Sequence, residues 1–289
     1  MNKTEILFIN HASCLISYKD ISILSDPWYE GSSFNDGWNL LFENDDKDIR
    51  SILSRTNYIW ISHEHPDHFS IPFFKKYKDF LKENKIKILF QKTKDKRVLS
   101  FISSLNLCFI ELDPSQEFKL DNLISIKCFK EGFYDSSLYI ETPDMNILNL
   151  NDCEIRSSNE AKKIRDNCKN IDVMLTQFSY AAWKGGRNNI EWRKKAAKEK
   201  LKTISFQAKY FSPKFIIPFA SFFYFSNKDN FYLNDSSNSP ENVISNGDYG
   251  LSRVIVMKPN DIFDGKENVS LTKNAIEFWN KRLNYYLRK

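Results

Sequence analysis

The chain has 289 residues, of which 42% are hydrophobic, and a formal net charge of +5. This length and apolar fraction are sufficient for one sizeable buried core, so we predict a single domain over residues 1–289. No apolar stretch approaches membrane-spanning length, so no membrane partner is expected.

Strand and helix patterns alternate along most of the chain. Short apolar runs predict strands at residues 6–9, 14–17, 21–24, 58–61, 86–90, 108–111, 123–128, 138–141, 146–150, 173–176 and 215–218. Helical spacing predicts helices at residues 71–83, 159–168, 190–210 and 272–287. Residues 34–38 are expected to form an aromatic-rich loop, and the polar run 227–250 a long loop without a core.

Basic residues are spread along the chain, and their densest run covers residues 193–202 in a predicted helix. A solvated helix face is the favoured interpretation, with attraction of an anionic substrate as the alternative. No nucleic-acid recognition motif accompanies the charge, so no nucleic-acid partner is expected.

The cysteines indicate a reducing compartment. There are five, they stand far apart, and none forms a CxxC pair. This pattern favours reduced thiols and argues against an iron–sulfur cluster held by the chain. The N-terminus also lacks the hydrophobic region of a signal peptide. We therefore expect a cytoplasmic protein.

Three of the four histidines lie within six residues, in the run HEHPDH at residues 63–68. The strand predicted before this run would deliver it as a rigid loop, which argues against unbound surface histidines. In an extended loop, residues two apart point the same way, so His63 and His65 can hold one metal ion. Asp67 and His68 can then face a second ion. Imidazole and carboxylate are ligands that zinc and iron accept.

This run resembles the signature of the metallo-β-lactamase superfamily, whose members include zinc hydrolases and some di-iron oxygen enzymes. The resemblance implies an α/β fold, a four-layered αββα sandwich in one domain. The predicted helix at residues 272–287 would then dock on an outer face of that sandwich.

The same resemblance implies further ligands. Asp152 follows the strand at residues 146–150, where the superfamily places an aspartate that bridges both metals. The superfamily also has a histidine about twenty residues earlier, which this chain lacks. Glu131 is the best substitute there, with Asp135 as its rival or as a hydrogen-bond partner of a ligand. His11 can fill a missing C-terminal ligand position or hydrogen-bond a ligand.

Several segments resemble the catalytic domain of the CMP-N-acetylneuraminate hydroxylase family, over most of residues 5–235. They comprise residues 26–38, 60–68, 147–153, 177–186 and 218–220. Asp26 belongs to the first of them and is expected at the metal site, as a ligand or as the partner of one. That family hydroxylates a nucleotide-activated sialic acid with electrons from a Rieske cluster and an external carrier. No Rieske cysteine–histidine pairs occur here.

The favoured function is an iron-dependent hydroxylase (monooxygenase) that acts on a small, polar, anionic substrate such as a nucleotide sugar. A carboxylate ligand in place of an imidazole favours iron, with zinc or manganese as alternatives. Asp67 and Asp152 would be the catalytic carboxylates. An external electron donor would serve as partner. Substrate-binding candidates, which equally fit an ordinary surface turn, are Lys184, Gly185, Gly186 and Arg187.

Two other functions stay open. One is a zinc-dependent hydrolase of lactone, phosphodiester or amide bonds, as in other members of the superfamily. The other is a non-catalytic metal-binding scaffold, which the missing histidines suggest. Metal content discriminates among the three, because iron favours the hydroxylase, zinc the hydrolase, and no stoichiometric metal the scaffold.

Overall fold

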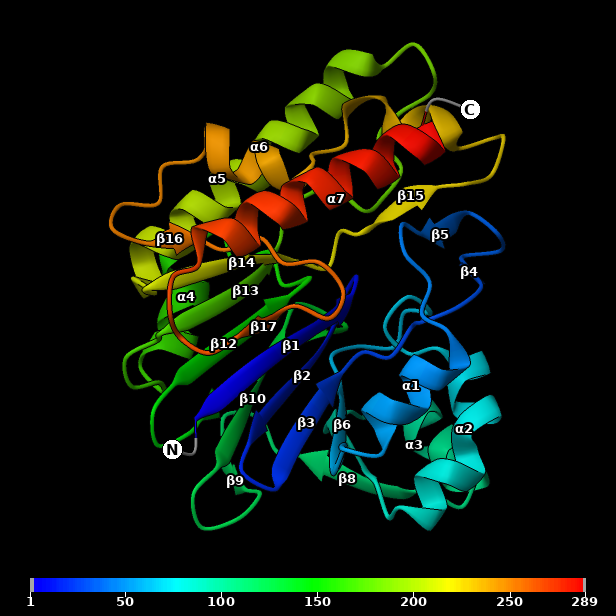
Figure 1. The fold of residues 1–289 in the computed structure, drawn as a ribbon, viewed down its shortest axis with the longest axis vertical. Coiled ribbons are helices and arrows are strands. Elements are labelled where there is room, and N and C mark those ends of the chain that lie inside the picture. The colour runs from blue at the N-terminus through cyan, green and yellow to red at the C-terminus, as the bar shows by residue number, and fades with distance from the viewer. Residues whose placement is uncertain (1–2, 288–289) are drawn as a thin grey trace.

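The computed structural model describes residues 3–287 and shows two sheets that face each other, with helices on both outer sides (Figure 1). The first sheet contains, in spatial order, β17 (Ile262–Phe263), β1 (Thr4–Asn10), β2 (Ser13–Tyr18), β3 (Ile21–Ser25), β6 (Tyr58–Ile61), β7 (Lys87–Gln91) and β8 (Cys108–Leu112). The second contains β16 (Arg253–Val254), β14 (Phe215–Phe219), β13 (Val173–Gln177), β12 (Asn146–Asn151), β11 (Asp135–Glu141), β10 (Ser125–Glu131) and β9 (Glu117–Lys119).

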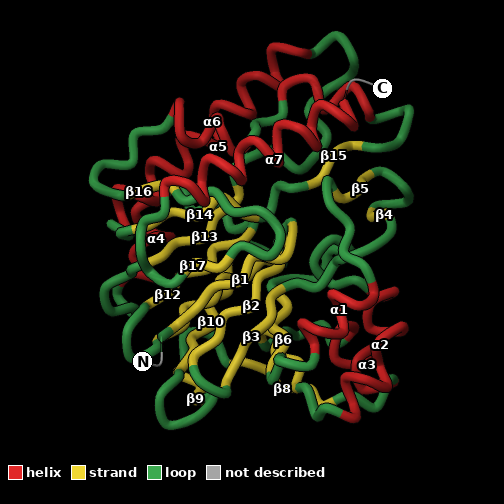
Figure 2. The backbone as a smooth tube through the Cα atoms, in the orientation of Figure 1, coloured by secondary structure: helices red, strands yellow, loops and turns green. Residues whose placement is uncertain are grey.

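Helices flank the strands on both sides (Figure 2). One group is α1 (Asp46–Leu53), α2 (Ile71–Glu83) and α3 (Arg97–Ser104), and the other is α4 (Ser158–Arg165), α5 (Ile190–Phe211), α6 (Pro240–Asn246) and α7 (Val269–Leu287). The four-layered αββα sandwich predicted from the sequence is confirmed, in a single domain. Within residues 3–287, no helix has both the length and the apolar character needed to cross a membrane.

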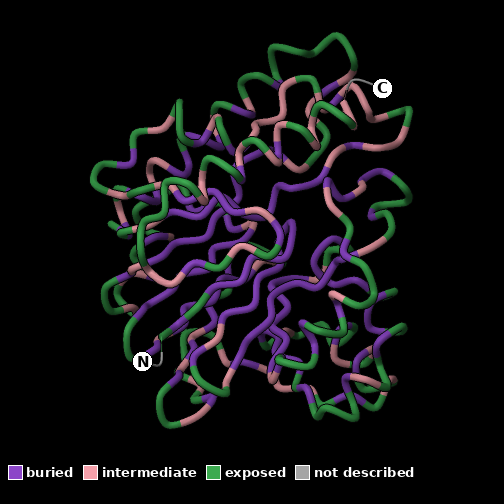
Figure 3. Tube along the Cα trace, viewed as in Figure 1, coloured by how far each residue is buried: buried purple, intermediate pink, exposed green. Residues whose placement is uncertain are grey.

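Strand β6 shows why the sheets are buried on both faces. All four of its residues are buried, as the central strands are in Figure 3. Trp60 joins the apolar cluster that links the two sheets, whereas Ile59 and Ile61 join the cluster under α1, α2 and α3. Successive strand residues point to opposite faces, so an all-apolar run fits a strand covered on both sides. Polar residues begin at Ser62, where the chain leaves the sheet.

The polar run at residues 227–250 is not the coreless loop predicted from the sequence. It contains a 3-10 helix, η1 (Phe231–Ser236), and helix α6, each of which buries an apolar residue, Leu233 and Val243. Single apolar residues in a polar run carry no periodicity, which is why the pattern missed them.

The aromatic segment at residues 34–38 also contributes to a strand. A small third sheet joins β15 (Phe223–Phe225), β5 (Trp38–Leu40) and β4 (Ser32–Ser33). Its centre is the stacked pair of Trp38 and Phe223, with ring centroids 4.0 Å apart. This pairing joins segments nearly two hundred residues apart in the chain, which no local pattern can reveal.

Candidate metal centre

The HEHPDH run lies in the loop that leaves the carboxyl end of β6, an interior strand of the first sheet. His63, Asp67 and His68 are buried, whereas His65 is exposed. The backbone amide of His68 donates to the carbonyl of His65 (3.0 Å), and this tight turn brings the His68 ring back beside that of His63, with centroids 4.1 Å apart. The buried strand before the loop and the turn within it hold the run in one geometry.

Two groups of side chains could each hold a metal ion, and they share His68. The first group is His63, His68 and Asp152, and the second is His11, Asp67 and His68. In each, one potential ligand atom per residue lies within 4.8 Å of the others. His68 Nε2 is 3.4 Å from Asp152 Oδ2 and 3.2 Å from Asp67 Oδ2, so this ring stands between the two groups.

His11 reaches the second group from the turn between β1 and β2. Its Nε2 lies 3.4 Å from Asp67 Oδ2, and its side chain is almost fully buried. The rings of Trp28 and Phe223 enclose it, with centroids 5.4 and 5.6 Å away. His11 is therefore near enough to Asp67 and His68 to form a potential metal site with them.

Buried polar atoms without hydrogen-bond partners converge on this centre. They include both ring nitrogens of His11, Asp67 Oδ1, His68 Nε2 and Asp152 Oδ1. Buried polar atoms are normally paired, because an unpaired one loses its bonds to water without compensation. Nitrogen and carboxylate oxygen are donors for zinc, iron and manganese. The residues present therefore fit two metal ions.

Asp26 fixes the orientation of His68. Its Oδ2 lies 2.9 Å from His68 Nδ1, and its Oδ1 accepts the backbone amide of Ser62 at 2.8 Å. The Ser62 hydroxyl and the Asn151 side-chain amide donate to the same carboxylate. A carboxylate on one imidazole nitrogen leaves the other free for a metal, as in many metal sites. Asp26 thus lies on the side of the His68 ring opposite to Asp67 and Asp152.

The acidic and basic groups shift one another's protonation. Burial, together with repulsion from His68, lowers the pKa of His63 to about 4, so this ring is neutral at neutral pH. Burial opposes the charge of Asp67, but His68 and His11 outweigh it and hold the pKa of Asp67 well below its usual range. Burial also disfavours charge on His68, whereas Asp67 and Asp152 raise its pKa well above the ordinary value. The centre therefore favours a cation, and a metal ion can take that place.

The structure separates Glu131 from Asp135, the two candidates for the same ligand position. Asp135 Oδ1 lies 3.8 Å from His63 Nε2, and Nδ1 of His65 lies 3.0 Å from that same Nε2 atom. Glu131 is the strand partner of Asp135 across the β10–β11 hairpin, but its other electrostatic neighbours are Lys163 and Glu160 on α4. The geometry therefore favours Asp135, the predicted rival, beside His63 and His65.

A cavity of about 850 Å³ opens over this centre. His65, Asp67, Asp135 and Asp152 line its floor. Its walls carry aromatic and charged side chains: Phe34, Trp38, Tyr180, Trp183, Trp192, Phe225, Glu154, Arg156, Lys184, Lys195, Glu199 and Lys200. A concave site with a few charged groups at its base is the usual form of a small-molecule site.

Of the four residues predicted to bind the substrate, one lies in the cavity wall and three do not. Lys184 lines the cavity, but Gly185, Gly186 and Arg187 do not belong to its lining. The guanidinium of Arg187 instead donates to Lys228 O at 3.1 Å and lies over the Tyr232 ring, 5.1 Å from its centroid. These three residues form the turn that leads into α5.

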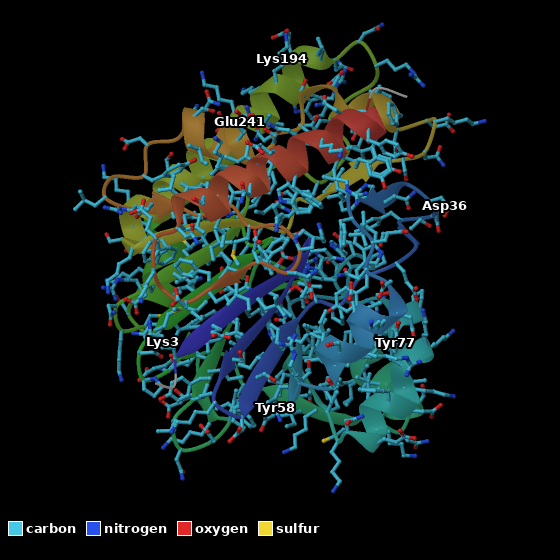
Figure 4. All side chains as sticks on the ribbon, viewed as in Figure 1. Lys3, Asp36, Tyr58, Tyr77, Lys194 and Glu241 are labelled. Atoms are coloured by element: carbon cyan, nitrogen blue, oxygen red, sulfur yellow. The ribbon has the colours of Figure 1, made fainter. Side chains whose placement is uncertain are left out.

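The basic run at residues 193–202 is not the uniformly solvated face that was favoured. Lys194 lies exposed on α5 (Figure 4), but Arg193 is fully buried. Arg193 donates to the carboxylate of Asp235 at 2.8 and 2.6 Å and to the carbonyl of Gly186 at 2.7 Å. Lys200 is also buried, where its ammonium contacts Glu154 and Gln177.

Sequence reasoning missed several residues of the cavity. Trp183 and Trp192 stand in its wall although both are exposed, and Lys200 faces it from α5. The signal of the two tryptophans was weak, because aromatic residues are common in this chain. Lys200 belongs to the basic run for which attraction of an anionic substrate was the alternative interpretation. Only the packing of α5 against the loop after β13 (Val173–Gln177) brings them together.

In sequence, the chain is similar to the cytidine monophosphate-N-acetylneuraminic acid hydroxylase of Xenopus laevis, with 26% identity over 251 residues. This match covers 81% of the chain but 41% of the relative, so the chain spans about two fifths of the length of that relative. The protein of that name from Danio rerio is equally similar, with 26% identity, 81% of this chain and 41% of the relative covered. No protein-family model matches the chain.

Three solved structures share the fold. CmlA, a diiron β-hydroxylase from Streptomyces venezuelae, matches with a TM-score of 0.62 at 9% identity over 91% of this chain and 54% of CmlA. Igni18, a metallo hydrolase from Ignicoccus hospitalis, gives 0.61 at 14% identity, with 90% and 97% covered. YhfI of Bacillus subtilis, a metallo-β-lactamase fold protein, gives 0.54 at 12% identity, with 91% and 99% covered. The chain therefore has the metallo-β-lactamase fold.

Proposed function

We propose that the chain is a metal-dependent hydroxylase that uses two metal ions, with iron favoured, on a small polar and anionic substrate such as a nucleotide sugar. The observation that carries the proposal is the convergence of ligand atoms without hydrogen-bond partners from His11, Asp67, His68 and Asp152. Asp67 and Asp152 line a cavity whose wall also carries Lys184, Lys195 and Lys200. The similarity in sequence to hydroxylases that are named for a nucleotide-activated sialic acid supports this substrate class.

The residues of the chain divide the work. His11, Asp67 and His68 would hold one ion, His63, His65 and Asp135 the other, and Asp152 would lie between them. When bound, two iron ions would supply oxygen activation, and two zinc ions would supply an ionised water. Asp26 keeps the His68 ring oriented through its 2.9 Å contact with Nδ1. The burial of His63, Asp67 and His68 keeps bulk water away from these atoms.

The substrate would enter through the cavity with its anionic part toward the lysines. Lys184 and Lys195 line the wall, and neither forms an ion pair with any residue in the described part of the chain. Unpaired ammonium groups in a concave site attract anions and concentrate them there.

Hydroxylation also needs electrons, and an external donor protein would supply them. The partners would then be this donor and a small-molecule substrate, without nucleic acid or membrane. A cytoplasmic location is part of the proposal and is supported by five free cysteines.

A zinc-dependent hydrolase is the second candidate. Its support is the likeness of fold to Igni18, a metallo hydrolase, together with a ligand set that contains four histidines. Histidine-rich sites suit zinc, whereas carboxylate oxygen shifts the preference toward iron and manganese. The choice therefore depends on which metal the protein holds and on the origin of the oxygen atom that it adds.

Isotope labelling tests the proposal. Protein purified without chelator should contain iron. When it is supplied with a nucleotide sugar, a reductant and labelled dioxygen, the hydroxylated product should carry the label. Asp152→Ala should abolish this turnover, whereas Asp113→Ala removes an exposed carboxylate paired with Lys92 at 2.8 Å and should not. Zinc in the purified protein, with product oxygen that comes from labelled water, would replace the hydroxylase with the hydrolase.

A further inference from the structure

Two tryptophans stand unusually open at the rim of the cavity. The side chain of Trp183, in the loop after β13, is 62% exposed, and that of Trp192, in the first turn of α5, is 45% exposed. Their ring centroids are 5.5 Å apart at an angle of 83°, so one ring presents a face beside the edge of the other. Both rings line the cavity that contains the metal centre.

The rings are held in place although solvent reaches them. Gly185 has a φ of +81°, and a Cβ atom there would lie 2.8 Å from Cε3 of Trp192. The turn thus packs directly against the indole ring, and a larger residue would push that ring away. Arg193 fastens the turn further, because it donates to the carbonyls of Gly186 and Arg187 at 2.7 and 2.9 Å. Two exposed rings held in this way are preorganised, so a ligand that binds them loses little free energy to ordering the side chains.

Cationic groups lie beside the rings. Lys195 follows Trp192 by three residues, one helical turn along the same face of α5, and Lys184 follows Trp183 directly. Other charges in the wall already have partners, since Arg156 lies 2.7 Å from Glu154 and Lys202 lies 2.9 Å from Glu199. In the described part of the chain, Lys184 and Lys195 form no direct ion pair. Glu154 and Glu199 act on them only from further away, so both ammonium groups keep their hydrogen-bond donors for an anion.

We propose that Trp183, Trp192 and Lys195 form a subsite for a planar heteroaromatic ring that carries an anionic group. A flat ring can lie against the face of one indole and the edge of the other, which are the two arrangements that aromatic pairs prefer. The inference rests on the proposed function in one respect, that the same cavity receives the substrate. It adds that specificity comes from a ring held outside the metal centre.

Two ligands separate recognition of the ring from recognition of phosphate. Cytidine 5′-monophosphate carries a ring and a phosphate, whereas ribose 5-phosphate carries the phosphate alone. Calorimetry on the metal-loaded protein should give a dissociation constant about tenfold lower for the nucleotide, since stacking on an aromatic side chain has about this effect. In the double variant Trp183→Ala/Trp192→Ala, this difference should vanish, while the affinity for ribose 5-phosphate stays unchanged.

Control variants show that the effect belongs to the rings. Trp192→Phe keeps a ring and should retain most of the preference, and Leu251→Ala removes a fully exposed apolar side chain outside the cavity and should leave it intact. Lys195→Met should weaken both ligands alike. A double variant that still prefers the nucleotide as strongly as the wild type would overturn the subsite, as would a wild type that binds both ligands equally.

This test is independent of the reaction. Binding is measured without turnover, so loss of the nucleotide preference in the double variant supports the subsite even if product oxygen comes from water. Conversely, an unchanged preference overturns the subsite and leaves the labelling result for the hydroxylase intact.

Discussion

His68 Nδ1 lies 2.9 Å from Asp26 Oδ2, and this contact joins the end of β3 to the loop after β6. The contact gives the two ring nitrogens different partners: Nδ1 faces Asp26, and Nε2 faces Asp67 and Asp152 at 3.2 and 3.4 Å. Asp26 itself adopts a positive φ of 35°, which brings its carboxylate under the ring. A non-glycine residue in this conformation is uncommon and marks a position fixed by its surroundings.

Asp26→Asn should therefore weaken metal binding without removing a ligand. Asparagine tolerates a positive φ, so the backbone can stay as it is, but the amide cannot accept all the hydrogen bonds that the carboxylate does. Loss of such a partner typically lowers metal affinity about 10–100-fold. Competition with a metal-binding dye measures this. Asp20→Asn, in the exposed turn after β2, is the matched control, and equal affinity of the two variants would contradict the role of Asp26.

Loss of His11 should remove one metal ion and spare the other. His11→Asn suits the positive φ of 24° at this position, but its shorter side chain cannot reach as far as the imidazole. The metal content should fall from two ions to one per chain, because Asp67 and His68 alone are too few ligands to retain an ion at that site. Phe223→Leu changes the wall around His11 without removing a donor and should keep both ions. Full occupancy in His11→Asn would exclude it as a ligand.

Asp135 and Glu131 offer a paired test of the remaining ligand position. Asp135→Asn should lower the affinity of the site at His63 and His65 by more than about 10-fold, because the loss of a ligand should cost at least as much as the loss of a ligand's hydrogen-bond partner. Glu131→Gln should have little effect, because that carboxyl faces Lys163 and Glu160 rather than the histidines. The reverse result would identify Glu131 as the ligand, as the sequence predicted.

The sequence predicted the elements whose pattern is local. Helix α2 (Ile71–Glu83) and strand β6 (Tyr58–Ile61) agree with their predicted ranges to the residue. The helix has apolar residues at helical spacing, and the strand is a continuous apolar run that ends at the polar Ser62. Helices α1 and α3 were not predicted, although α4, which also has eight residues, was. The histidine run was equally local, so its role as the centre of the site could be predicted.

What the sequence could not supply are contacts between distant residues. The choice between Glu131 and Asp135 depends on how the β10–β11 hairpin is placed against β6, which is a property of the packed sheets. His11 meets Asp67 only because the turn after β1 lies beside the loop after β6. Likewise, nothing in the basic run marks Arg193 as buried, because its partner Asp235 lies 42 residues further along the chain.

The pair of Arg193 and Asp235 leads to a prediction about stability. Arg193 is fully buried, so Asp235→Asn would leave its charge without a counter-ion and should destabilise the fold by about 2–4 kcal/mol. Glu191→Gln removes the exposed partner of Lys194 and should change the free energy of unfolding by less than about 1 kcal/mol. Urea unfolding of the metal-loaded protein measures both.

The destabilisation by Asp235→Asn should also depend on pH. Partial burial opposes the charge of Asp235, but Arg193 outweighs it and lowers the pKa of this carboxyl below its ordinary value. A carboxyl with a lowered pKa in the folded state stabilises the fold above its unfolded pKa of about 3.9, and this contribution is lost as the pH falls through the folded value. The difference in unfolding free energy between wild type and variant should thus be full at about pH 6 and smaller at about pH 3. A difference that stays constant over this range would show that Asp235 acts by packing and not by charge.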